Sequence, residues 1–215
     1  MMTKRTKRSA GENLIEQLLS NPAKFNDSGL AYNLLQQFFE GLPLAYLQSL
    51  LKDDNSYVKR AAIWIASELG RDAAVLLDDI LPLMQFEDRY IKFYTIECIT
   101  VCAIGENAPK FIHGVQALQD NDLVIRVRAM ELMVNAHISQ LEAALSRVKD
   151  GDPFADIHRF GLATLIAGDK VTFETAAKMV DDRSALVKRY GAILGKKLSV
   201  AHPELLERYR LADDP

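Results

Sequence analysis

Apolar and polar residues follow one another along this chain with the period of an amphipathic helix, and one arrangement of them occurs five times. In the first copy, residues 53–68, an acidic turn is followed by Val58, the basic Lys59 and the small Ala62. The β-branched residues of successive copies are separated by 33, 34, 32 and 30 residues. They are Val58, Ile91, Ile125, Ile157 and Val187. A repeat of this length is typical of a stacked helical array.

An apolar stripe precedes each acidic turn, so each copy predicts two antiparallel helices. Residues 42–198 hold the five repeats, residues 11–41 predict a pair that caps the stack, and residues 203–211 predict a last short helix. We therefore expect an all-α fold, a right-handed α–α superhelix of about five to six helix pairs, in which each pair buries its apolar face against its neighbours. The whole of 11–215 is expected to form a single domain.

Turn-forming residues predict where the helices end. The Asn-Pro pair at 21–22 is expected to stop the first helix, and Asp27 or Ser28 to cap the next. The first helices of the second and third repeats are expected over 73–84 and 108–118. Glycines are expected to close several helices. They are Gly41, Gly70, Gly105 and Gly168.

A small residue stands four positions after each β-branched residue, where two helices are expected to approach closely. These residues are Ala62, Thr95, Ala129, Gly161 and Gly191.

The chain has 215 residues and a formal charge of -3, but four of its positive charges lie within residues 1–10, so the remainder carries -7. We expect residues 1–10 to be a disordered basic leader. The leader lacks the apolar run of a secretory signal, and no later stretch is long enough to cross a bilayer. These features predict a cytoplasmic protein, and the acidic body makes nucleic acid an unfavoured partner.

The sequence offers little catalytic or metal-binding chemistry. Cys98 and Cys102 lie four apart on an apolar helical stretch and are expected to be reduced core residues. The four histidines have no metal-ligand spacing, and no phosphate-binding or nucleophile motif occurs. We therefore expect no catalytic residues, no metal and no cofactor, and a protein that is not an enzyme. The histidines are His113, His137, His158 and His202.

The acidic turn, the Val-Lys/Arg step and the following small residue resemble HEAT repeats of the armadillo-like class over residues 42–198. This resemblance implies that the second helices line a concave groove. It also implies that the basic residue of each copy pairs at the surface with an acidic turn, rather than forming a ladder that binds phosphate. These basic residues are Lys59, Lys92, Arg126, His158 and Lys188.

The face of the second helices that the core is expected to leave free lies three, six and ten positions after each β-branched residue. The first of these columns runs from Ala61 to Tyr190, and the second from Trp64 to Ile193. Aromatic residues and arginine beside carboxylates are typical of interface hot spots. We predict a partner-binding site made of Arg60, Trp64, Glu68, Tyr94, Glu97, Arg128 and Glu131.

The sequence thus predicts a non-enzymatic module for protein–protein interaction. Small bacterial HEAT-like proteins that look similar include immunity proteins, which bind and neutralise a toxin, and an acidic groove would suit a basic toxin. Two alternatives remain open. One is a protein resembling the HEAT-like DNA alkylation-repair glycosylases, whose groove would use Arg60, Arg128, Arg159 and Arg189. The other is a lyase or assembly chaperone of the phycobilisome type, for which no chromophore-handling residue can be named.

Overall fold

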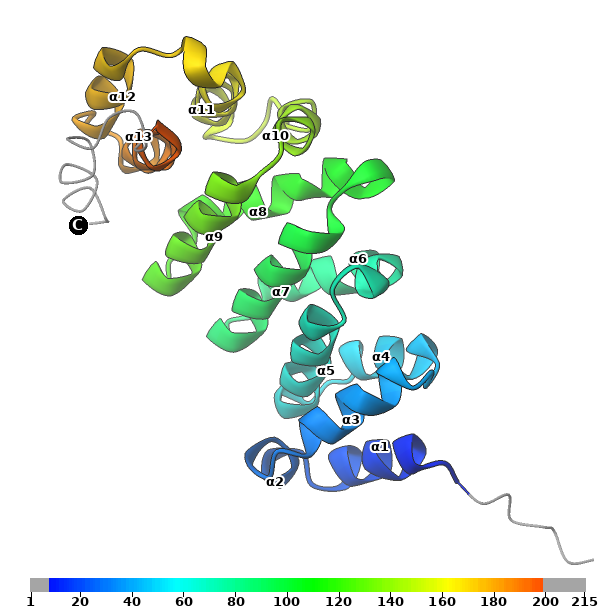
Figure 1. Cartoon of the computed structure of the whole chain (residues 1–215). Coiled ribbons are helices and arrows are strands. Elements are labelled where there is room, and N and C mark those ends of the chain that lie inside the picture. The colour runs from blue at the N-terminus through cyan, green and yellow to red at the C-terminus, as the bar shows by residue number, and fades with distance from the viewer. Residues whose placement is uncertain (1–7, 199–215) are drawn as a thin grey trace, which may run out of the picture. The chain divides into compact units, whose positions relative to one another are not determined.

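The computed structural model describes residues 8–198, and within that range it is built from helices without a strand (Figure 1). This confirms the predicted all-α class. The chain divides into two compact units, one ending at Cys98 and the other beginning at Ile99. The single domain predicted for 11–215 and its superhelical arrangement stay predictions, and each unit is described by itself.

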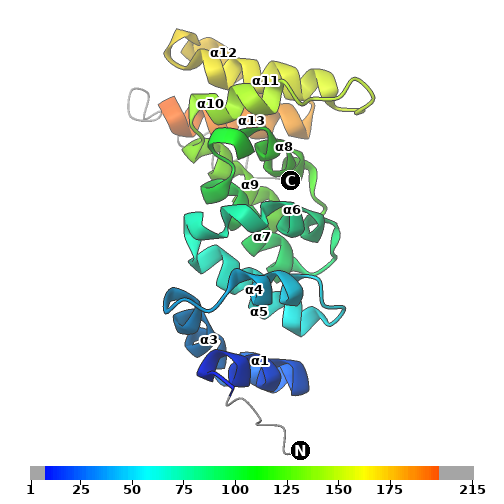
Figure 2. The same ribbon diagram turned by 90° about the vertical axis from the view of Figure 1, so that its right-hand side faces the viewer.

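The N-terminal unit contains three helices before the first repeat and the helix pairs that follow. Helix α1 packs against α2 and α3, and α4 packs against both α5 and α6. Figure 2 views this unit with α4 and α6 toward the reader. Its elements are α1 (Ala10–Ser20), α2 (Pro22–Asp27), α3 (Leu30–Phe39), α4 (Leu44–Leu51), α5 (Ser56–Glu68), 3-10 helix η1 (Gly70–Leu76), α6 (Leu77–Ile80), 3-10 helix η2 (Leu81–Gln85) and most of α7 (Arg89–Cys102).

The C-terminal unit is built mainly of the pairs α10–α11 and α12–α13, with α8 packed against α9. Helix α13 also contacts α9 and α11, so neighbours cover it on several sides. The elements after α7 are η3 (Gly105–Phe111), α8 (Ile112–Gln116), η4 (Ala117–Gln119), α9 (Leu123–Asn135), α10 (Ile138–Leu145), α11 (Ala155–Ala167), η5 (Gly168–Lys170), α12 (Phe173–Val180) and α13 (Ala185–Leu198).

The acidic turns before α5, α7 and α9 cap these helices, as predicted, whereas α11 begins after Phe154 without a side-chain cap. Asn55 Oδ1 accepts a hydrogen bond from the backbone N–H of Tyr57 at 2.9 Å, and Asp122 Oδ1 accepts one from Val124 at 2.9 Å. Asp88 Oδ1 does the same for Tyr90 at 3.0 Å. Each bond satisfies an N–H group that the first helical turn leaves without a partner.

The first helices of the second and third repeats are not continuous, which corrects the predictions for 73–84 and 108–118. Each is split into a 3-10 segment, a short α-helix and a second 3-10 segment. Pro82 lies at the start of η2 and Pro109 lies inside η3. Proline has no N–H to donate, so it interrupts the α-helical ladder. Gly70, with a left-handed φ of 58°, directly follows the C-cap of α5 as predicted. Gly105 also has a left-handed φ, of 55°, but α7 already ends at Cys102, so the predicted helix end at Gly105 is wrong.

The ends of the first three helices differ from the prediction. Helix α1 does end at Ser20, but Pro22 opens the additional helix α2. The predicted cap at Asp27 or Ser28 is wrong, because Gly29 holds that position with a left-handed φ and no side-chain bond. Ser9 instead caps α1, because its hydroxyl oxygen accepts a hydrogen bond from the backbone N–H of Glu12 and its own N–H donates to the Glu12 carboxylate. The predicted leader 1–10 therefore includes this cap and the first residue of α1. Residues 1–7 lie outside the described part. The helix predicted over 203–211 also lies outside it.

The small residues of the repeats are buried where helices meet, as predicted. A Cβ added to Gly191 would lie 2.8 Å from the backbone nitrogen of Val180 in the neighbouring α12. At Gly161 an added Cβ would lie 2.4 Å from the Tyr190 ring. The prediction of buried, reduced cysteines is confirmed as well: Cys98 and Cys102 lie in the core and form no disulfide, and burial raises the pKa of Cys102 to about 11.

His158 is fully buried, which contradicts its predicted place in a surface ion pair. Its Nδ1 lies 2.8 Å from the hydroxyl of Tyr190, and its Nε2 lies 2.8 Å from Nε2 of Gln119. Because an amide nitrogen only donates, His158 Nε2 accepts and Nδ1 donates to Tyr190. The ring is thus a core hydrogen-bonding group that joins α11, α13 and η4.

Two other basic residues of the repeats also turn toward the backbone. Lys59 is buried, and its ammonium group donates to the backbone carbonyl of Asp53. The same Nζ lies 4.8 Å from the centre of the Phe86 ring. Arg126 donates to the carbonyls of Asp120 and Asn121 at 2.9 and 3.0 Å. In these copies the basic side chain therefore bonds to backbone carbonyl groups of the turn that precedes its helix. The prediction of surface ion pairs did not include this role.

We expect Gly191→Ala to destabilise the protein, although alanine favours a helix by about 1 kcal/mol. The new methyl group would press on the backbone of α12, and overpacking of this kind costs about 1–3 kcal/mol and sometimes more. Gly151→Ala is the matched control, because nothing lies within 4 Å of an added Cβ there. Urea unfolding measures both, and an unchanged or higher stability of Gly191→Ala would contradict the close packing of α12 and α13.

We expect stability to fall as the pH drops below about 6.5, the usual pKa of histidine. Burial lowers the pKa of His158, and the charge of Asp152 offsets only part of this effect. The unfolded chain therefore binds this proton at a pH where the native ring stays neutral, which costs at most about 1.4 kcal/mol per pH unit. Urea titrations from about pH 7.5 to about pH 5.5 should show a shallower slope for His158→Gln than for the wild type. Equal pH dependence of the unfolding free energy in the two proteins would contradict a lowered pKa of His158 in the native state.

Candidate functional site

Arg60 organises an exposed cluster between α5 and the start of α7. Its Nε lies 2.5 Å from Oδ2 of Asp88, and its guanidinium carbon lies 5.4 Å from the centre of the Tyr57 ring and 5.1 Å from that of Tyr90. Both tyrosines are exposed, at 44% and 59%. A cation between two aromatic faces, with a carboxylate at its edge, is held in place at the surface.

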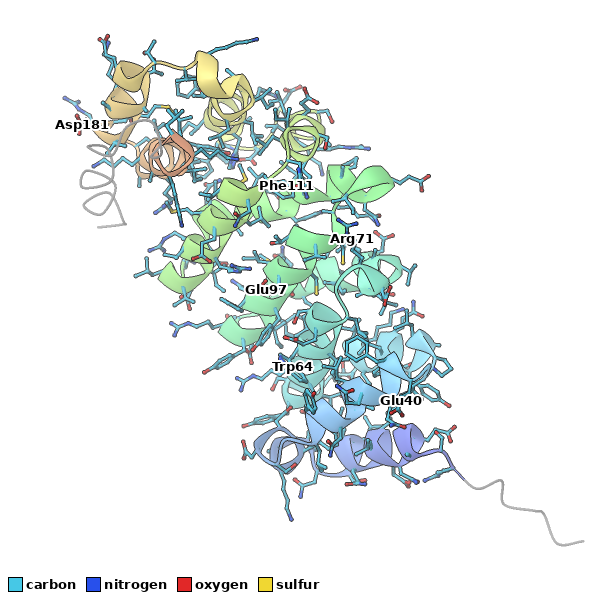
Figure 3. All side chains as sticks on the ribbon, in the orientation of Figure 1. Glu40, Trp64, Arg71, Glu97, Phe111 and Asp181 are labelled. Atoms are coloured by element: carbon cyan, nitrogen blue, oxygen red, sulfur yellow. The ribbon has the colours of Figure 1, made fainter. Side chains whose placement is uncertain are left out.

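Trp64, Glu68, Tyr94 and Glu97 continue this surface along α5 and α7. Trp64, Tyr94 and Glu97 are half-buried, and Glu68 is exposed. Burial raises the pKa of Tyr94, and the charges of Glu68 and Glu97 raise it further, so both carboxylates lie near its hydroxyl group. Figure 3 shows Trp64 and Glu97 on the side of these helices that faces away from α4 and α6.

We call this cluster the α5–α7 surface and define it by Tyr57, Arg60, Trp64, Glu68, Tyr90, Tyr94 and Glu97. The structure brings together within it five of the seven residues predicted for the partner site. Arg128 and Glu131 belong to the C-terminal unit, where Arg128 Nη1 and Glu131 Oε2 form an ion pair of 2.7 Å. Their membership of one continuous groove stays a prediction.

Sequence reasoning missed Tyr57 and Tyr90, although a signal was present. Each tyrosine stands one position before the β-branched residue of its repeat, on the stripe that Trp64 continues. The predicted free face was wrong elsewhere, because Ala61, Tyr190 and Ile193 are all buried. Helix α13 packs against α9, α11 and α12, so its core face is wider than a single helix pair would require.

Among residues 8–198, no group of three or more His, Cys, Asp or Glu side chains is placed to hold a metal ion. In the same range, no helix has both the length and the apolar character needed to cross a membrane. The groups that the α5–α7 surface presents are aromatic rings, a guanidinium held by Asp88 and the carboxylates of Glu68 and Glu97.

Searches among protein families and curated proteins found no family model and no protein that matches this chain.

We expect Trp64→Ala to lower stability by less than about 1.5 kcal/mol, because the indole is only half-buried and leaves no closed cavity. Ile63→Ala is the matched control on the same helix, since Ile63 is fully buried and its truncation should cost about 2–5 kcal/mol. Urea unfolding gives both values. Equal losses for the two variants would show that Trp64 is part of the core.

Proposed function

We propose that this chain is a non-enzymatic HEAT-like solenoid that binds a protein partner through its α5–α7 surface. The observation that carries the proposal is the aromatic and arginine cluster, in which Arg60 is held between Tyr57 and Tyr90 beside the half-buried Trp64. Tryptophan, tyrosine and arginine dominate interface hot spots. A pre-ordered guanidinium also loses less conformational freedom when a partner binds.

The partner in this proposal is a basic protein. Glu68 and Glu97 place two negative charges around Tyr94, and residues 11–215 are acidic as a whole. Complementary charge speeds association and disfavours acidic competitors. A basic toxin neutralised by an immunity protein is the form of this proposal that the HEAT-like repeats suggest.

The arginines proposed for a DNA-binding groove are engaged within the protein. Arg60 pairs with Asp88, Arg128 pairs with Glu131, and Arg159 pairs with Asp150 and Asp156. Arg189 donates to the carbonyl of Leu118 at 2.9 Å. Binding to duplex DNA requires cations that neutralise phosphates, so these contacts favour a protein partner over DNA.

We expect Trp64→Ala and the double variant Glu68→Lys, Glu97→Lys to lose a partner that the wild-type protein captures from cells. Glu142→Lys is the matched control, because this exposed carboxylate lies on α10 of the C-terminal unit. With the purified partner, the double variant should slow association at low salt and lose most of this effect at high salt, since salt screens exposed charges.

Equal capture by the wild type and all variants would contradict a role for the α5–α7 surface. A duplex-DNA titration runs alongside. Tight binding that persists at about 0.2 M salt, where non-specific electrostatic binding weakens strongly, would favour the glycosylase alternative instead.

A further inference from the structure

A cavity of about 400 Å³ in the C-terminal unit combines several positive charges with hydrogen-bond donors. It lies between η3, α8 and the segment that follows α10, elements that pack against one another. We call it the η3–α10 cavity. Its polar lining comes from Glu106, Lys110, His113, Gln116, Arg147 and Lys149.

The charge of this lining is opposite to that of the rest of the protein. The lining contains three cationic residues, Lys110, Arg147 and Lys149, and one carboxylate, Glu106, so its formal charge is three minus one, an excess of two positive charges with His113 neutral. The chain as a whole carries -3. Burial lowers the pKa of His113, and the charge of Lys149, which lines the same cavity, lowers it further.

We propose that the η3–α10 cavity binds a small organic phosphate through Arg147, Lys149 and Lys110. A phosphate monoester carries about -1.5 to -2 at neutral pH, which matches the excess positive charge, whereas a carboxylate supplies only one charge. The guanidinium of Arg147 can hold two phosphate oxygens at once. His113 and Gln116 add groups that can donate hydrogen bonds to further oxygens.

The organic part of the ligand is expected from the rest of the lining. Pro109 and Ile112 give the cavity an apolar wall. The volume falls within the range of about 300–1,000 Å³ that is usual for small-molecule sites. An ion alone would leave this wall without a contact, so a phosphate attached to an organic body fits the cavity better.

The test follows the ring protons of His113 by NMR while the pH is varied, with His113→Gln used to identify the signal. Inorganic phosphate, AMP and adenosine are added separately at constant ionic strength, up to about 20 mM. Phosphate and AMP should raise the pKa of His113, because a negative charge within about 4–6 Å favours the imidazolium. AMP should act at a lower concentration than phosphate, and adenosine should leave the pKa unchanged.

Two exposed side chains provide the variants. Arg147→Gln should raise the half-saturating AMP concentration at least about fivefold, because it removes a charge-assisted hydrogen bond. Lys149→Gln should raise the pKa of His113 before any ligand is added. Lys178→Gln is the matched control, since Lys178 is exposed on α12 and pairs with Glu174, and it should change neither value.

Any of several results would overturn this proposal. They are an unchanged pKa of His113 with both phosphate ligands, an equal effect of sodium chloride or adenosine, and AMP binding that is insensitive to Arg147→Gln. An acidic peptide such as triglutamate that shifts His113 where AMP does not would also overturn it. The cavity and the α5–α7 surface belong to different units, so neither result depends on the other.

Discussion

The side-chain caps at the starts of α5, α7 and α9 are the interactions on which the other features depend. Asn55 and Asp122 each accept a bond from a first-turn N–H and thereby fix the residue at which the helix begins. Each residue turns an α-helix by about 100°. A start displaced by one residue would therefore carry Ala62 and Ala129 away from the neighbouring helix, and would bring bulkier side chains into their place.

The residue at which each helix begins also decides which of its side chains reach the surface. When Val58 and Ala62 point into the core, Arg60 and Trp64 lie on the opposite side, where Arg60 meets Asp88 at the cap of α7. Asp88 thus has two roles, since one oxygen begins α7 and the other holds the guanidinium. The residues of the proposed binding surface are therefore positioned by the same turns that organise the repeats.

Features that depend on local sequence were predictable, and features that depend on distant neighbours were not. The acidic caps, the buried small residues and the burial of Cys98 and Cys102 each follow from spacing within one helix or turn. The burial of His158 requires Tyr190 and Gln119, which lie 32 and 39 residues away, and spacing within one repeat contains no sign of them. Tyr190 and Ile193 were misplaced because α13 is covered by three helices. The η3–α10 cavity likewise joins residues from separate segments.

The contact between Gly161 and Tyr190 limits which repeats can stand next to each other in this chain. The ring fills the volume that the missing side chain leaves, and its hydroxyl meets His158 from the same helix as the glycine. The fourth and fifth repeats are therefore complementary and cannot be exchanged for other copies. A gene duplication that placed either beside a different neighbour would set tyrosine against a Cβ or leave a buried imidazole without its hydroxyl. We therefore expect an exchange of either repeat alone to destabilise the protein, and an exchange of both together to preserve this contact.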